Sequence, residues 1–127
     1  MLRFISHLSK FPFEKEFHNE DELLEFVDQL LMKAETEKED GLCLQKEDIV
    51  WAFGNIKEFI GNYKKKNLDF LDYYDKIEVD EWVVYFYLKP GEVLREADLD
   101  IIDEALGGNE IEINYDSYEG KLYIKIW

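Results

Sequence analysis

The chain has 127 residues, and its 30 acidic and 15 basic side chains give a formal net charge of −15 at pH 7. This length fits a single domain, and an apolar content of 46%, with 16% aromatic residues, argues against a disordered chain. The excess of acids opposes binding to nucleic acid or to an anionic membrane and favours basic partners.

The N-terminal part of the chain is the hardest to interpret. Residues 1–18 are apolar enough for partial burial, and residues 13–17 begin and end on phenylalanine with charged residues between. We predict a short edge strand or an irregular arm here.

A helix is predicted from Glu20 to Glu37, because Asn19 is a good N-cap residue and Glu22 follows it three positions later. Its apolar residues share one stripe, which predicts an amphipathic helix with an acidic outer face.

A second helix is predicted from Lys46 to Lys66, after a polar exit over residues 38–41 that ends in a glycine. Gly54 and Gly61 each weaken this helix by about 1 kcal/mol relative to alanine. They indicate either close packing against a neighbour or a break. The helix ends in three lysines at positions 64–66, where the helix dipole favours cations. This basic cluster therefore needs no explanation in terms of nucleic acid.

The charge of the chain changes from basic to acidic after the three lysines. Over positions 67–81, acids are interleaved with apolar and aromatic residues. Residues 68–74 fit either a helical turn or a loop, and residues 76–79 alternate like a half-exposed strand. Seven consecutive apolar or aromatic residues, Trp82 to Leu88, then predict a strand that is buried on both faces. We expect the rest of the domain to cover this strand.

A third helix is predicted from Arg95 to Leu106. Leu99, Ile102 and Leu106 lie on its apolar stripe, and Gly107-Gly108 ends it. The acids of its outer face are Glu96, Asp100, Asp103 and Glu104.

The last segment predicts a β-hairpin. Apolar and polar residues alternate over 111–115 and again over 122–126, and a polar turn lies between them. The whole chain then has the order α-α-β-α-β-β. This order predicts one α+β domain over residues 1–127, with an antiparallel-rich sheet and helices packed on one face.

Side chains able to bind a metal or to act as a nucleophile are few. His7 and His18 lack the cysteine or histidine neighbours of a zinc site. Cys43 is the only cysteine, which excludes a disulfide within the chain, and its apolar neighbours predict a buried, inert thiol. We therefore predict no metal and no cofactor.

Met1 is not followed by an apolar run of signal-peptide length, so we expect a cytoplasmic protein.

The nearest approach to an active-site pattern is Glu119-Gly120-Lys121, since many metal-dependent nucleases place an acid-x-lysine on a strand with an aspartate upstream. Here the triplet falls at the predicted hairpin turn, so we interpret it as turn chemistry. Asp98, Asp100 and Asp103 lack the glycine and the later glutamate of a Ca²⁺ loop. A small Mg²⁺-dependent hydrolase that uses carboxylates from this set stays open as an alternative function.

The distribution of charge gives the leading functional hypothesis. The excess of acids is concentrated in residues 1–40 and 68–106, whereas residues 41–67 carry more bases than acids. Carboxylates three or four residues apart on a helix have Cβ atoms about 5–6 Å apart, which resembles the spacing of phosphates along a nucleic-acid strand. Such a face would fit a basic cleft that is built for DNA or RNA. The plainer explanation is a solvated, solubilising face.

We therefore predict a non-enzymatic antagonist or immunity-type inhibitor that binds a basic protein, for example a nuclease countered by a phage anti-defence protein. Exposed tyrosine and tryptophan would anchor the interface, while carboxylates steer the encounter; Trp82 and Tyr118 are further aromatic candidates. A structural or assembly subunit is a third possibility. The predicted contact residues are Asp21, Glu25, Asp28, Asp69, Asp72, Tyr73, Tyr74, Asp75, Glu96, Asp100, Asp103 and Glu104.

Overall fold

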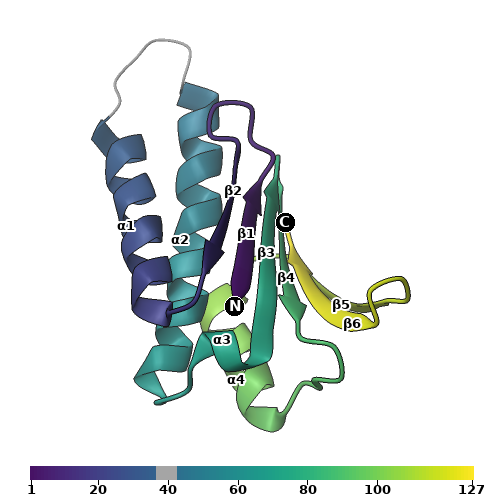
Figure 1. The fold of residues 1–127 in the computed structure, drawn as a ribbon. Helices are drawn as coiled ribbons and strands as arrows, with labels where there is room; N and C mark the ends of the chain where they lie inside the picture. Colours follow the sequence, from purple (N-terminus) through teal and green to yellow (C-terminus); the bar gives the residue numbers. More distant parts are fainter. Residues whose placement is uncertain (37–42) are drawn as a thin grey trace.

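The computed structural model describes residues 1–36 and 43–127, and it describes only the backbone of residues 35–36 and 43–46. The described part of the chain forms a six-stranded sheet that is covered on one face by helices (Figure 1). The strands are β1 (Leu2–Ser6), β2 (Phe13–Phe17), β3 (Tyr74–Asp80), β4 (Val83–Leu88), β5 (Ile111–Asp116) and β6 (Lys121–Ile126). The helices are α1 (Glu20–Thr36), α2 (Cys43–Lys65), α3 (Phe70–Tyr73) and α4 (Glu96–Leu106).

The strands lie in the order β2-β1-β3-β4-β6-β5 across the sheet. Only β1 and β3 pair in parallel, and every other neighbouring pair is antiparallel. The predicted α+β class and the antiparallel-rich sheet are confirmed. The predicted C-terminal hairpin is confirmed as β5 and β6.

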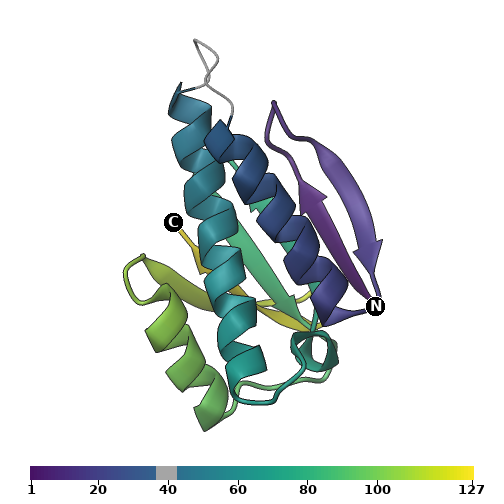
Figure 2. The same ribbon diagram turned by 90° about the vertical axis from the view of Figure 1, so that its left-hand side faces the viewer.

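The helices form a second layer on one face of the sheet. Figure 2 shows α1, α2 and α4 in front of the strands, and α2 packs between the other two. The core between the layers is rich in aromatic rings. Phe59 of α2 contacts Phe86 of β4, with ring centroids 4.7 Å apart, and Phe70 of α3 stacks on Tyr74 of β3 at 4.2 Å. Helices on one face, as predicted, leave the opposite face of the sheet uncovered.

The N-terminal region differs from the prediction, because it forms a hairpin of two strands before the first helix. β2 is the edge strand, whereas β1 lies inside the sheet and pairs with both β2 and β3. The side chains of Leu2, Phe4 and Ser6 are buried, which the short apolar run did not specify. α1 and α2 then form the connection that places β1 parallel to β3.

β4 is covered on only one face, contrary to the prediction. Val84, Phe86 and Leu88 lie under the helices, whereas Tyr85 and Tyr87 are only half-buried on the uncovered face. The error arose because tyrosine rings count as apolar in the sequence pattern but tolerate partial exposure. Trp82 was also placed in this strand, but it belongs to the β3–β4 turn with φ of 68°.

The apolar stripe of α4 is also corrected. Ile101, Ile102 and Leu106 are buried, whereas Leu99 is exposed and Asp98 is buried in its place. A helical stripe predicts burial from side-chain polarity alone, so it cannot identify an acid that is buried with its partners.

α2 corrects the interpretation of its two glycines. The helix runs unbroken through Gly54 and Gly61, and a Cβ atom added at either position would meet nothing within 4 Å. Neither a break nor close packing explains them. The predicted polar exit over residues 38–41 lies outside the described residues.

Candidate functional site

The outer face of α4 presents exposed acids. The side chains of Glu96, Asp100 and Asp103 are exposed, and in the described part of the chain no cationic group lies within ion-pair distance of them. Glu104, the residue after Asp103, lies 3.8 Å from Lys66 of α2. Three of the four predicted contact acids on this helix therefore carry uncompensated charge.

α3 adds two acids at the end of the molecule where α4 begins (Figure 1). Asp69 and Asp72 are both exposed, and Asp69 caps α3 by accepting a hydrogen bond from the Leu71 backbone N–H at 3.0 Å. The Arg95 guanidinium lies 3.9 Å from the centroid of the Tyr73 ring and so joins α3 to the start of α4. The exposed acids of α3, including its N-cap, and of α4 for which the described part of the chain offers no ion-pair partner are called the α4 acidic surface. Its members are Asp69, Asp72, Glu96, Asp100 and Asp103.

The acids of α1 are partly neutralised. Asp21 pairs with Lys64 at 2.7 Å and Asp28 pairs with Lys57 at 2.7 Å, both lysines coming from α2. Glu25 is exposed on the same helix. Lys64, one of the three lysines at the C-terminus of α2, thus also pairs with the neighbouring acidic helix.

One predicted contact residue is excluded by burial. Tyr74 is fully buried, and its hydroxyl lies 2.8 Å from the hydroxyl of Tyr63. Tyr63 in turn donates to Asp98 Oδ1 at 2.6 Å. Burial raises the pKa of both tyrosines well above the usual value. Tyr74 is therefore a core residue that cannot contact a partner.

Asp98 is buried because its carboxylate is fully engaged. Arg95 donates to it from the backbone N–H at 2.8 Å, from Nε at 2.9 Å and from a terminal guanidinium nitrogen at 3.0 Å. Burial alone would raise the pKa of Asp98, but the hydrogen bonds from Arg95 and Tyr63 outweigh it and lower that pKa. The acid anchors the start of α4.

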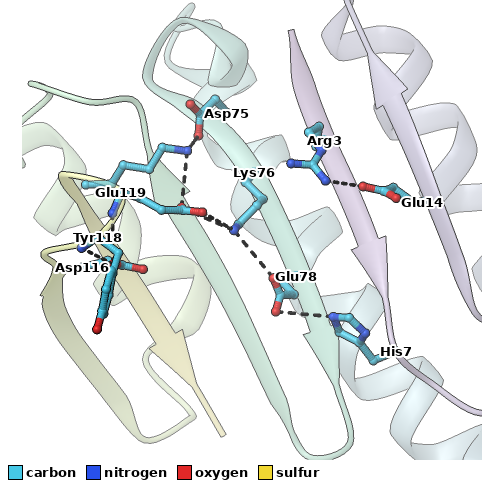
Figure 3. A network of polar contacts seen from close by, with 10 residues as sticks. Arg3, His7, Glu14, Asp75, Lys76, Glu78, Asp116, Tyr118 and Glu119 are labelled. Carbon is cyan, nitrogen blue, oxygen red and sulfur yellow. Dashed lines mark hydrogen bonds and ion pairs between the residues drawn. The ribbon is translucent and has the colours of Figure 1, made fainter.

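The uncovered face of the sheet carries a network of ion pairs (Figure 3). Lys121 lies 2.5 Å from Asp75, and Lys76 lies 3.3 Å from Glu119 and 3.8 Å from Glu78. Both lysine side chains are only 12% exposed. Asp75, a predicted contact residue, is thus already paired within the chain.

The network extends to the edge of the sheet, where His7 lies 3.4 Å from Glu78 and Arg3 pairs with Glu14. We call these pairs, together with those of Lys76 and Lys121, the sheet-face network.

Aromatic rings lie among the charges of the sheet-face network. Tyr85, Tyr87 and Tyr123 have ring centroids 5.4–6.1 Å apart, and Lys76 Nζ lies 4.2 Å from the centroid of the Tyr87 ring. Burial raises the pKa of Tyr87 to about 12, and acids nearby add to the effect. Tyr118 is completely exposed at the tip of the β5–β6 hairpin. The lysines of this face are therefore occupied by acids and rings of the chain itself.

The residues of the alternative enzyme hypothesis are not brought together. Asp98 is buried, Asp100 and Asp103 lie on the outer face of α4, and Glu119 with Lys121 belongs to the uncovered face of the sheet. Asp75, which sequence reasoning did not assign to this set, does join Lys121, but each acid there is paired with a lysine. No group of three or more potential metal ligands occurs in the described part of the chain. The side chain of Cys43 lies outside the described residues.

A pocket of about 380 Å³ is the feature that sequence reasoning missed. It is lined by Trp51, Trp82 and Trp127, which are all the tryptophans of the chain, together with Glu47 and Asp48. Only Trp82 was singled out from the sequence. No local pattern could have found the others, because the three tryptophans come from distant segments of the chain.

A larger depression, of about 490 Å³, lies near the start of α1. Three of its charged groups are already used within the chain. Lys64 pairs with Asp21, and the Glu20 carboxylate accepts a hydrogen bond from the Phe70 backbone N–H at 2.8 Å.

Comparison with known proteins found no relative, since no protein-family model, curated protein or solved structure matches the chain. In the part of the chain that the structure describes, no helix has both the length and the apolar character needed to cross a membrane.

Proposed function

We propose that this protein is a non-enzymatic binding protein whose α4 acidic surface docks on a basic surface of a protein partner. The observation that carries the proposal is that Glu96, Asp100 and Asp103 are exposed and that no cation of the described residues lies within ion-pair distance of them. Like charges on one helix face repel each other, and a basic partner relieves this repulsion. Uncompensated surface charge also accelerates encounter with a partner of opposite sign.

The spacing of these acids favours a partner that handles nucleic acid, such as a nuclease. Glu96 and Asp100 are four residues apart and Asp100 and Asp103 are three apart, so their Cβ atoms repeat at about 5–6 Å along the helix. A row of charges at that spacing offers a phosphate-binding cleft an alternative ligand. On this proposal the protein acts as an antagonist in the cytoplasm, of the immunity or anti-defence type, and it binds no nucleic acid itself.

Tyr73 is the aromatic side chain best placed to support this contact. It is half-buried, it lies next to Asp72, and the Arg95 guanidinium holds its ring. A ring that is already fixed loses little conformational entropy on binding, which is typical of anchor residues at protein interfaces. The α4 acidic surface thus supplies charge for steering, and Tyr73 beside it supplies a rigid ring for contact.

The test compares two double variants with identical changes of charge. Asp100→Lys with Asp103→Lys reverses the α4 acidic surface, and Glu22→Lys with Glu25→Lys reverses two exposed acids of α1. Tagged wild-type and variant proteins are used to capture partners from host lysate at low and high salt, and captured proteins are identified by mass. Captured proteins are then challenged with duplex DNA.

The proposal predicts that wild type and the α1 variant retain the same basic protein at low salt, that high salt releases it, and that the α4 variant fails to capture it. Added DNA should displace the chain from the partner, because both ligands would occupy one cleft. Equal capture by both variants would contradict the α4 surface. Absence of any salt-sensitive basic partner would remove the antagonist function and return attention to Mg²⁺-dependent hydrolysis.

A further inference from the structure

We propose that the tryptophan pocket binds an arginine side chain presented by the protein partner. This inference rests on the proposed function, because it supplies the point at which that basic partner is recognised in detail. The pocket is formed by Glu47, Asp48 and Trp51 of α2, by Trp82 of the β3–β4 turn, and by Trp127 at the end of β6.

The walls of the pocket are held in place by hydrogen bonds. Trp51 Nε1 donates to Asn109 Oδ1 at 2.9 Å, and Asn109 Nδ2 donates to Asn55 Oδ1 at 2.8 Å and to the Leu106 carbonyl at 3.1 Å. The Trp127 backbone exchanges two hydrogen bonds with Glu110, at 3.1 and 3.2 Å. The Trp51 ring is therefore fixed by its own hydrogen bond, and the backbone that carries the Trp127 ring is fixed by its pairing with Glu110.

Asn109 also connects the pocket to the proposed docking surface. It lies three residues beyond Leu106, the last residue of α4, and its side chain bonds both the Leu106 carbonyl and Trp51 of the pocket. The acids of α4 thus line a helix that leads from α3 to the tryptophan pocket. One basic partner lying along α4 would bring a side chain to the pocket.

Trp82 is the third wall, and its conformation carries a cost. Its φ of 68° lies in the left-handed region, which bulky side chains rarely adopt, and its large ring is 63% exposed. Backbone strain of about 1–3 kcal/mol is concentrated at functional sites in proteins. A turn with glycine here would avoid the strain, so keeping an exposed tryptophan at this position indicates a role for its ring.

The chemistry of the pocket matches a cation. The faces of tryptophan rings attract cations more strongly than those of other aromatic residues, and Lys125 Nζ already lies 5.1 Å from the centroid of the Trp127 ring. Burial raises the pKa of Asp48, and repulsion by Glu81 and Glu47 adds to the effect. A cation in the pocket would relieve this crowding of negative charge.

Arginine fits these features better than lysine. Its planar guanidinium stacks on aromatic rings and presents parallel N–H donors to a carboxylate, whereas an ammonium is a compact and strongly hydrated charge. A volume of about 380 Å³ lies within the usual range of ligand pockets. The occupant is identified by charge complementarity, since no cation of the described side chains lies within ion-pair distance of Glu47 or Asp48 and a neutral ligand would supply none.

The test uses a short blocked peptide with one central arginine, and the same peptide with citrulline, a neutral analogue of the same shape. Binding is followed through the indole N–H resonances of the three tryptophans and through tryptophan fluorescence. We expect the arginine peptide to shift the indole resonances and to bind about tenfold more tightly than the citrulline peptide, a ratio worth about 1.4 kcal/mol.

Two variants test the pocket. Trp82→Gly removes one ring at a position where glycine is the favoured residue, so the fold should persist while arginine binding weakens. Asp48→Asn with Glu47→Gln should remove the preference for arginine over citrulline. Equal binding of the two peptides to wild type, or no indole shift at the highest soluble concentration, would overturn the inference.

The outcomes separate this inference from the proposed function. Asp100→Lys with Asp103→Lys should lose the basic partner in the capture experiment but still bind the arginine peptide, because these residues lie outside the pocket. If wild type captures a basic partner through α4 while the arginine peptide fails to bind, the tryptophan-pocket inference is wrong and the docking function stands.

Discussion

The uncovered face of the sheet and the outer face of α4 are both rich in acids, but they differ in whether those acids form ion pairs within the chain. On the sheet, Lys76 and Lys121 lie within ion-pair distance of the carboxylates of Asp75, Glu78 and Glu119 and offset most of their charge. On α4, Asp100 and Asp103 have no described cation within reach. The acids of the sheet-face network are therefore engaged within the chain, whereas Asp100 and Asp103 are available to another molecule.

This difference shows why net charge alone is a weak guide to function. A total of −15 describes both surfaces equally, yet the acids of the sheet-face network have cations at ion-pair distance, whereas the described part of the chain offers none to Asp100 and Asp103. Whether a carboxylate is available to a partner depends on whether it already has a cation of the chain at ion-pair distance. A surface network of mutual pairs contributes to the fold, and uncompensated acids are available for steering and contact.

The largest expected effect comes from α4 itself, which carries acids of both kinds. Asp98→Ala should destabilise the protein by about 2–3 kcal/mol, because it leaves the buried Tyr63 hydroxyl without its acceptor and removes the hydrogen bonds that Arg95 donates at the start of α4. Asp100→Ala, two residues further along the same helix, should change stability by no more than about 0.5 kcal/mol. Urea unfolding of the two variants measures both values. Similar losses would mean that α4 does not separate structural from exposed acids.

A smaller effect is expected on the sheet face. Lys121→Met should cost about 1–2 kcal/mol, because the side chain of Asp75 is only 24% exposed and would lose its charged donor. Lys65→Met, at an exposed position on α2, is the matched control and should be nearly neutral. Thermal or urea unfolding would reveal the difference. If Lys121→Met were as harmless as the control, the sheet-face network would not be structural.

The pH dependence of stability separates the two kinds of acid in another way. The pKa of Asp98 is lowered in the folded protein, so its stabilising contribution is complete above the unfolded-state pKa of about 3.9 and is lost as the pH falls through the folded-state pKa. The stability gap between wild type and Asp98→Asn should therefore be constant near neutral pH and should narrow below about pH 4. A gap that stays constant down to the acid transition would contradict this assignment.

The smallest effect is expected where the sheet-face network reaches solvent. Arg3 and Glu14 form an ion pair in which both side chains are about half exposed, so water already solvates them. Arg3→Met should change stability by less than about 1 kcal/mol. A loss equal to that of Lys121→Met would show that the network acts as one cooperative unit, and the contrast between its buried and exposed pairs would be wrong.

The sequence predicted the regular elements well where one physical signal dominated. Periodic apolar residues gave α1 and α2 nearly their observed bounds, and alternation over 111–126 gave the β5–β6 hairpin. The N-terminal hairpin was not resolved, because β1 is short and is stabilised by β3, which lies more than 60 residues away in sequence. Pairing at that distance leaves no local pattern.

The candidate site was predicted only in part, because exposure and pairing are tertiary properties. Asp100 and Asp103 were identified correctly as exposed acids, but Asp75 has the same sequence context and is paired with Lys121. Tyr74 was chosen as an aromatic next to acids, although its ring belongs to the core. The tryptophan pocket needed three distant segments to meet, so only the structure could show it.

The most direct test of the contrast between the two surfaces is to map where a basic ligand binds. A hexalysine peptide would be titrated into isotope-labelled protein at low salt, and shifts of backbone amide resonances would be assigned to residues. We predict that the largest shifts fall on α3 and α4, around Asp72, Asp100 and Asp103, and that they vanish in Asp100→Lys with Asp103→Lys. Shifts centred on the uncovered face of the sheet, or spread evenly over all exposed acids, would contradict the account.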